Sequence, residues 1–192
     1  RLIHTSKFED YKKSEKALFV LPEFDGLPIE LYKYTISSQI NGNFYTSEIL
    51  ILPYFFIYGC PHSCIYCSYS KHPLSGVKDP VKVAEDLELL SKKYHTKYFI
   101  FLNTEINPTK EYALAVTREI IKRDLDLLWS DCASFKCMDM KLLESLRNAG
   151  AARLVWGLET GSPRILDYIQ KGIKLSHVEA CLKKSYQLGI WN

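Results

Sequence analysis

The stretch DPVKVAEDLELLSKKYHTKYFIFL, residues 79–102, predicts one helix followed by one strand. Asp79 before Pro80 is typical of an N-cap followed by proline at the first helical position. The apolar residues that come next recur at helical spacing: Val83, Leu87, Leu90 and Tyr94. This spacing indicates a helix with one buried face. The apolar run Lys97–Leu102 then predicts a strand that is buried on both sides.

The same alternation of strand and helix runs through most of the chain. Buried strands are predicted at Tyr54–Tyr58, Lys97–Leu102, Asp126–Ser130 and Ala152–Gly157. Helix starts are predicted at Asn107-Pro108, Asp139, Ser162-Pro163 and Ser176, the last in a capping box with Glu179. Fully apolar strands that alternate with helices predict an α/β fold, a parallel sheet covered by helices. Right-handed crossovers curl such a sheet toward a barrel.

The two ends of the chain depart from this alternation. Residues 1–43 lack it, and the segment PEFDGLPIELY, Pro22–Tyr32, indicates a linker or docking arm from a preceding domain. Residues 44–192 form the predicted core. The chain begins at Arg1, and Gly189–Asn192 indicate a fifth strand that does not finish. We therefore expect a fragment of a longer protein, truncated within its core.

Composition excludes several classes of function. The 192 residues are 47% hydrophobic and 24% charged, which is enough for one substantial core. A net charge of +3 argues against a nucleic-acid or membrane-surface protein. The longest apolar run, Ile49–Tyr58, contains Pro53 and is too short to span a bilayer. Six cysteines in a chain with this much aliphatic core favour a reducing, cytoplasmic setting over a disulfide scaffold.

Three of those cysteines lie in one loop, GCPHSCIYCSYS, residues 59–70, spaced C-x3-C-x2-C at Cys60, Cys64 and Cys67. Thiols this close favour a metal site. One alternative is zinc in a Cys3His site completed by His72, with His62 inside the loop, which makes the chain a non-enzymatic interaction module. The other is a [4Fe–4S] cluster, which usually has one cysteine for each iron and is here left with one iron open.

The cysteine loop resembles that of the radical S-adenosylmethionine (SAM) superfamily, since Tyr66 precedes the last cysteine and the loop follows the first predicted strand. The resemblance implies a partial (βα)6 TIM-like barrel of parallel strands with outer helices, of which this chain supplies about four units. It also implies that Cys60, Cys64 and Cys67 bind the cluster. One electron from that cluster cleaves SAM to a 5′-deoxyadenosyl radical that abstracts hydrogen from a substrate.

The resemblance implies further cofactor-binding residues. In FLNTEINP, Glu105 matches the acid of the family's Gly-Gly-Glu motif, which receives the SAM ammonium, while Asn103 and Thr104 replace its glycines. In WGLETGSPRIL, Glu159 lies in a G-x-E-[ST]-G-S signature and is expected to contact SAM. Tyr66 is expected beside the adenine. We predict no catalytic side chain beyond the cluster ligands.

Other polar residues receive structural interpretations. Lys171 is interpreted as a charge at a helix C-terminus. Cys132 and Cys137 are interpreted as structural, with the alternative that one of them reaches the active site, and Cys181 is interpreted as core. Ser134 stands where one branch of the family often has arginine. His62 and His72 border the cluster loop as candidate hydrogen-bond donors.

The segment PEFDGLP resembles the connector that follows a cobalamin-binding domain in part of the family. This favours a cobalamin-dependent class that transfers methyl groups or rearranges rings, with the cobalamin domain outside these residues. The family further implies an electron donor such as flavodoxin or ferredoxin. The substrate, a small molecule or a peptide, is not identified by the sequence.

Overall fold

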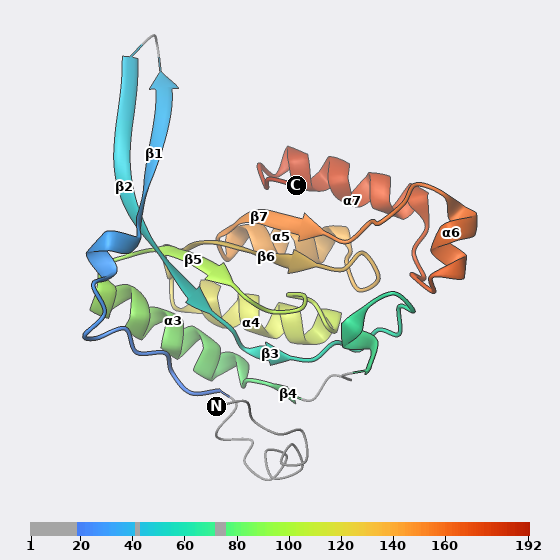
Figure 1. The fold of residues 1–192 in the computed structure, drawn as a ribbon, viewed down its shortest axis with the longest axis horizontal. Helices are drawn as coiled ribbons and strands as arrows, with labels where there is room; N and C mark the ends of the chain where they lie inside the picture. Colours follow the sequence, from blue (N-terminus) through green and yellow to red (C-terminus); the bar gives the residue numbers. More distant parts are fainter. Residues whose placement is uncertain (1–18, 41–42, 72–75) are drawn as a thin grey trace.

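A curled sheet of five strands organises the fold (Figure 1). The computed structural model describes residues 19–40, 43–71 and 76–192. The strand order is β1-β2-β5-β6-β7, in which β1 pairs antiparallel with β2 and every other neighbouring pair is parallel. The strands are β1 (Lys33–Ile40), β2 (Asn43–Tyr54), β5 (Tyr98–Phe101), β6 (Leu128–Ala133) and β7 (Ala151–Trp156).

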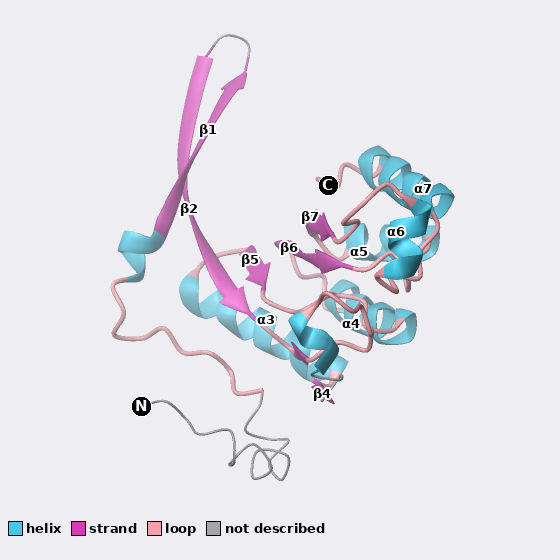
Figure 2. Ribbon diagram, turned by 45° about the vertical axis from the view of Figure 1, so that its right-hand side comes forward, coloured by secondary structure: helices cyan, strands magenta, loops and turns pink. Residues whose placement is uncertain are grey.

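Helices cover one face of this sheet and leave the other open (Figure 1). They are α3 (Pro80–Tyr94), α4 (Lys110–Lys122), α5 (Met140–Asn148), α6 (Pro163–Tyr168) and α7 (Leu175–Gln187). A two-stranded sheet of β3 (Ile57–Tyr58) and β4 (Gly76–Val77) and two 3₁₀-helices, η2 (Ile29–Tyr32) and η3 (Ser68–Lys71), complete the elements. The β1–β2 hairpin extends well beyond the helix-covered part of the sheet (Figure 2). The architecture confirms the predicted α/β fold as a curled half-barrel.

The core lies between the sheet and its helices. Phe101 and Trp129, on neighbouring strands, stack with ring centroids 4.9 Å apart. The Trp129 indole donates a hydrogen bond of 2.7 Å to the carbonyl of Ala149, so the tryptophan is both packed and satisfied. Gly150 then begins the turn into β7 at φ +97°, where a side chain would overlap the Leu127 carbonyl. This position requires glycine.

The parallel register sets which side chains share the open face. Pro53, Ile100, Ser130 and Arg153 are partners across β2, β5, β6 and β7. Because side chains alternate between faces, Phe99, Phe101 and Leu154 point into the core, while Ile100, Cys132 and Val155 remain exposed. Trp191 makes a parallel bridge to Arg153, which agrees with the strand start predicted at Gly189–Asn192.

Predictions that depended on local signals had mixed outcomes. Asp79 and Asp139 cap α3 and α5 through their side chains, as expected. The cap expected at Asn107-Pro108 is wrong, because Thr109 caps α4 and Asn107 bonds instead to the backbone of Ser134. The capping box at Ser176 is also wrong, since α7 begins at Leu175 after Lys174 and has no side-chain cap.

The strand boundaries also shifted. The strand predicted at Tyr54–Tyr58 is wrong as a sheet strand, because the sheet contains β2, which ends at Tyr54. The Asn103 side chain accepts hydrogen bonds from the amides of Phe56 and Ile57, at 2.9 and 3.0 Å, and so turns the backbone out of the sheet. The strand predicted at Asp126–Ser130 lies two to three residues later, as β6. Within the predicted arm of residues 1–43, Lys33–Ile40 forms β1, and the division into arm and core stays a prediction.

In the part of the chain that the structure describes, none of the helices combines the length and the apolar character that a bilayer crossing requires.

Candidate functional site

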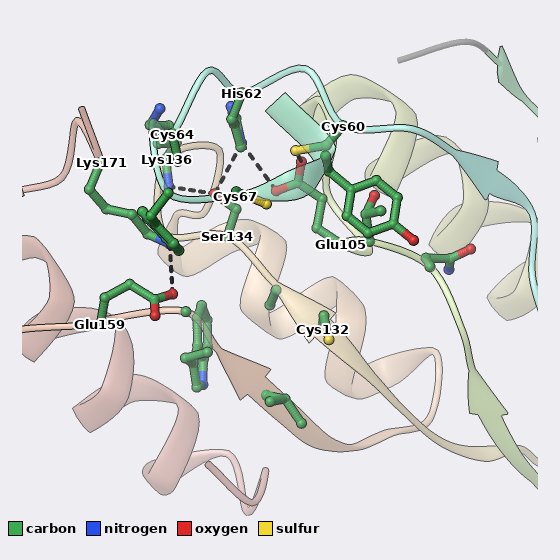
Figure 3. A pocket seen from close by; sticks show the side chains of 18 of the residues that line it. Cys60, His62, Cys64, Cys67, Glu105, Cys132, Ser134, Lys136, Glu159 and Lys171 are labelled. Atoms are coloured by element: carbon green, nitrogen blue, oxygen red, sulfur yellow. Dashed lines mark hydrogen bonds and ion pairs between the residues drawn. The ribbon is translucent and has the colours of Figure 1, made fainter. Parts of the chain in front are cut away.

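A cavity of about 540 Å³ opens where β5, β6 and β7 end, beneath the cysteine loop (Figure 3). We call it the cysteine cavity. Its walls come from four segments that are distant in sequence: residues 60–69, 102–105, 132–136 and 155–159. Lys171, after α6, completes the lining. The carboxyl ends of parallel strands are where α/β folds place their sites, so the location agrees with the sequence prediction.

All three cysteines of the loop line this cavity: Cys60, Cys64 and Cys67. The loop is tied to the fold on two sides, because Ile65 N–H donates to the Ile169 carbonyl at 3.2 Å and Thr104 donates to the Gly59 carbonyl at 2.6 Å. Three thiols held on one loop around one cavity form a donor set suited to a metal cluster. Burial raises the pKa of the Cys60 thiol to about 11, and the nearby Glu105 carboxylate adds to the rise. A metal that binds Cys60 must therefore displace a firmly held proton.

Glu105 is in direct contact with the cysteine loop. Its side chain is almost fully buried, and its two oxygens contact His62 Nε2 at 3.1 Å and Cys60 Sγ at 3.4 Å. His62 Nε2 also lies 3.2 Å from Ser134 Oγ (Figure 3). Cys60, His62 and Glu105 place their ligand atoms within 4.8 Å of one another, a spacing that could hold a metal ion. His62 thus contacts the Glu105 carboxylate at the cavity wall and also contacts Ser134.

Glu159 lies in the opposite wall of the cavity, where it pairs with Lys171. Lys171 Nζ donates to Glu159 Oε1 at 3.1 Å and to the Tyr66 hydroxyl at 2.9 Å. The interpretation of Lys171 as a helix-end charge is therefore wrong, because its side chain turns into the cavity and is only 15% exposed. The pair lies close to the backbone of Gly157, where a Cβ would come within 2.9 Å of Lys171 Nζ and 3.0 Å of Glu159 Oε1.

These contacts keep the Glu159–Lys171 pair charged. The hydrogen bond with Tyr66 lowers the pKa of Glu159 despite partial burial, and Lys171 lowers it further. Burial acts to lower the pKa of Lys171, but the hydrogen bonds to Tyr66 and Glu159 outweigh it and raise the pKa. Glu159 itself adopts φ +66°, a left-handed conformation that non-glycine residues seldom take outside functional turns.

A buried polar bridge lies under the cavity floor. Asn103 donates from Nδ2 to Asp131 Oδ2 at 2.7 Å, and Asp131 Oδ1 accepts from the Cys132 amide at 2.8 Å. Together with the two bonds from Phe56 and Ile57, Asn103 joins the ends of β5 and β6 to the start of the cysteine loop. Burial raises the pKa of Asp131 to about 8. In the sequence, Asn103 is only a departure from a glycine-containing motif, and no local signal predicts this role.

The other cysteines and His72 lie in different parts of the chain. Cys181 is fully buried, as predicted. Cys137 lies outside the cavity lining, with Sγ 3.8 Å from the Pro108 carbonyl. Cys132, interpreted as structural, is instead exposed and lines the cysteine cavity (Figure 3). His72, the zinc ligand of the alternative site, lies outside the residues that the structure describes.

Residues 54–192 match the sequence model of a family described as the radical SAM superfamily. A methyltransferase of Pyrococcus horikoshii, itself uncharacterized, is 26% identical over 178 residues, 88% of this chain and 35% of the relative. The anaerobic magnesium-protoporphyrin IX monomethyl ester cyclase of Rubrivivax gelatinosus is 32% identical over 119 residues, 60% of this chain and 21% of the cyclase. The chain therefore spans only a minor part of the length of these relatives.

Two solved structures share the fold. The radical S-adenosylmethionine methyltransferase TsrM of Kitasatospora setae, with cobalamin and a [4Fe–4S] cluster bound, superposes with a TM-score of 0.66 at 18% identity. The match covers 73% of this chain and 29% of TsrM. The cobalamin-dependent S-adenosylmethionine radical enzyme OxsB, with aqua-cobalamin bound, gives 0.60 at 19% identity, over 73% of this chain and 23% of OxsB. At these identities the likeness concerns the fold alone.

The raised pKa of Asp131 predicts a specific pH dependence of stability. Because the folded protein holds this proton up to about pH 8, against an ordinary value of 3.8, the unfolded chain binds fewer protons in between. The Asp131 contribution to the free energy of unfolding therefore falls as pH rises from 4 to 8, by up to about 1.4 kcal/mol per pH unit. Asp131→Asn should remove this slope, as measured by urea unfolding at several pH values.

The control for Asp131→Asn is Asp126→Asn, which removes an exposed carboxylate just before the same strand. A constant stability difference between Asp131→Asn and the unmodified protein from pH 4 to pH 8 would show that Asp131 is ionised throughout.

Proposed function

The chain belongs to the radical SAM superfamily, and from this premise we propose that Cys60, Cys64 and Cys67 bind a [4Fe–4S] cluster that cleaves SAM reductively. The observation that carries the proposal is the convergence of these three thiols with Glu105 and Glu159 on one cavity. When bound, the cluster supplies the electron that breaks a carbon–sulfur bond of SAM and yields a 5′-deoxyadenosyl radical. The protein's task is to hold the cofactor, orient it and exclude water.

Glu105 is assigned to the amino group of SAM. Its carboxylate is nearly buried and is held by His62, so it is pre-oriented and weakly screened by solvent. A cationic amine that reaches it gains a charge-assisted hydrogen bond. Cys60 touches the same carboxylate, which places the amine beside the cluster loop.

Glu159, Lys171 and Tyr66 are assigned to the opposite end of SAM. The Glu159 carboxylate accepts from Lys171, and its remaining lone pairs can accept from ribose hydroxyls. Tyr66 is 49% exposed at the cavity mouth, where its ring and backbone can contact the adenine. Lys171 bonds both Tyr66 and Glu159 and so keeps the two in a defined relation.

For the reaction class, we infer cobalamin-dependent methyl transfer, with ring rearrangement as the alternative within the same class. The support is the connector-like segment Pro22–Pro28 together with the methyltransferase named among the relatives and the two cobalamin-containing structures. In this proposal the cobalamin is bound outside residues 44–192. Reduction of the cluster requires a one-electron donor of the flavodoxin or ferredoxin type.

The cluster assignment predicts that Cys60→Ala, Cys64→Ala and Cys67→Ala each abolish 5′-deoxyadenosine formation from SAM and a strong reductant. The unmodified protein, purified without oxygen, should contain iron and sulfide in near-equal amounts. Cys137→Ala is the matched control and should retain both cluster and cleavage, because its thiol lies outside the cavity. Full cleavage by Cys60→Ala, or one zinc per chain without iron, would reject the assignment.

The assignment of Glu105 predicts weaker SAM binding by Glu105→Gln, by about tenfold or more, since a charge-assisted bond becomes a neutral one. The measurement is calorimetric titration of cluster-loaded protein under anaerobic conditions, with iron content determined in parallel. Glu111→Gln, at an exposed position in the first turn of α4, is the control. An unchanged Kd at equal iron content would remove Glu105 from the SAM site.

The cobalamin assignment predicts that the full-length protein co-purifies with cobalamin, or takes it up when it is added, as detected by its visible absorption. The Cys60→Ala variant should do the same, because the cobalamin site does not use the cysteine loop. Failure of the full-length protein to retain cobalamin in either experiment would exclude the cobalamin-dependent class.

A further inference from the structure

Four charged side chains line the cysteine cavity in the described part of the chain, and only two of them pair with each other. The carboxylates are Glu105 and Glu159, and the lysines are Lys136 and Lys171. Lys171 donates to Glu159, so these two charges largely neutralise each other. Glu105 instead contacts the cysteine loop, and no carboxylate of the described residues contacts Lys136.

Lys136 is half-buried at the cavity wall, yet its ammonium lacks a partner (Figure 3). Within the described residues, Lys136 Nζ has neither a hydrogen bond nor an ion pair. The side chain passes close to the backbone of Gly172, since a Cβ there would lie 2.9 Å from Lys136 Cε and 3.4 Å from Nζ. Packing thus holds this cation in place. A partly buried cation is costly without a counter-charge, so a ligand that brings an anionic group to it is favoured.

The turn after β6 that carries Lys136 is fixed by a distant side chain. Asn107 donates from Nδ2 to the Ser134 carbonyl at 2.8 Å and accepts from the Ser134 amide at 2.9 Å. Ser134 Oγ in turn accepts from the backbone amide of Lys136 at 3.3 Å. The backbone that positions the lysine is therefore already ordered, and a ligand that binds the ammonium has less conformational freedom to remove.

Ser134 also connects Lys136 to Glu105. His62 Nε2 lies 3.2 Å from Ser134 Oγ and 3.1 Å from a Glu105 oxygen, so one serine touches both the lysine backbone and the partner of the acid. The two charges act on a common neighbour, because burial raises the pKa of the Cys137 thiol, Glu105 adds to the rise and Lys136 opposes it. An acid and a lysine that line one cavity from linked positions are complementary to a zwitterion, a molecule with an ammonium and a carboxylate close together.

We propose that Lys136 binds the carboxylate of SAM, and that Lys136 and Glu105 together hold its amino acid group. The proposal rests on the function proposed above, which assigns the SAM ammonium to Glu105. The ammonium and the carboxylate of SAM are bonded to the same carbon atom, so the residues that receive them have to be neighbours. Lys171 would have to share its ammonium with Glu159 to take this role, whereas Lys136 is free of such a bond. Lys136 therefore selects for ligands that carry a carboxylate beside the amine.

The test compares SAM with decarboxylated SAM, which keeps the nucleoside, the sulfonium and the amine. Both are titrated by calorimetry into the cluster-loaded, full-length protein without oxygen, with iron content determined in parallel. The unmodified protein should bind SAM about tenfold or more tightly than decarboxylated SAM. Lys136→Gln should weaken SAM by about this factor and leave decarboxylated SAM unchanged. Lys141→Gln, which removes an exposed lysine from the first turn of α5, should keep the preference.

A second variant separates charge from shape. Lys136→Arg keeps the positive charge and should retain a preference for SAM that Lys136→Gln has lost. Equal binding of the two ligands by the unmodified protein, or a preference that survives Lys136→Gln, would overturn the proposal. Equal weakening of both ligands by Lys136→Gln would show that the lysine acts on the fold of the site and not on the carboxylate, and would overturn it as well.

The titration measures binding without a reductant, so its outcome is independent of cleavage activity. If the unmodified protein cleaves SAM but shows no preference for the carboxylate, only the assignment of Lys136 fails. If the preference and its loss in Lys136→Gln are found but SAM is not cleaved, the proposed reaction fails and the carboxylate site remains. If the cluster-loaded protein binds neither ligand, both proposals fail.

Discussion

The site depends on one buried amide. Asn103 accepts two backbone hydrogen bonds from the residues that lead into the cysteine loop and donates one to Asp131 at the end of the next strand. Without it, two interior amides would lose their acceptor, at a cost of about 1–3 kcal/mol for each group, and Asp131 would keep only its bond from the Cys132 amide. The same three bonds determine where β2 leaves the sheet and therefore where the cysteines begin. The position of the cysteine loop and the stability of the carboxyl ends of β5 and β6 thus depend on the same side chain.

The alternation of side chains along the strands explains how one small sheet serves two purposes. On β6, Trp129 and Asp131 point toward the helices and supply packing and the polar bridge, whereas Ser130 and Cys132 face the open side. On β7, Leu154 is buried between Arg153 and Val155, which are both exposed. A shift of register by one residue would exchange these sets and place Arg153 in the core. The burial of Phe101, Trp129 and Leu154 therefore determines the chemistry of the opposite face.

The sequence predicted the features that depend on neighbours in the chain. The caps at Asp79 and Asp139, the alternation of strands and helices and the spacing of the three cysteines are all local signals, and the structure agrees with each. Two of the errors share a different cause. Asn107 and Lys171 have the residue types expected of a cap and a helix-end charge, but each finds a stronger partner in a distant segment: Ser134 for Asn107, and Glu159 and Tyr66 for Lys171. Spacing in the sequence carries no information about such contacts.

The replacement of two glycines in the family's Gly-Gly-Glu pattern follows from the same long-range contacts. Glycine at position 103 could not accept from Phe56 and Ile57, and glycine at position 104 could not donate to the Gly59 carbonyl. In this chain Asn103 therefore binds the residues that lead into the cysteine loop, Thr104 binds the first residue of the loop, and Glu105 alone keeps the family's residue. The acid next to these two residues is then held by the loop it serves, because His62 and Cys60 both contact it. The two replaced glycines thus connect Glu105 more firmly to the cysteines. The contacts come from three consecutive side chains, Asn103, Thr104 and Glu105.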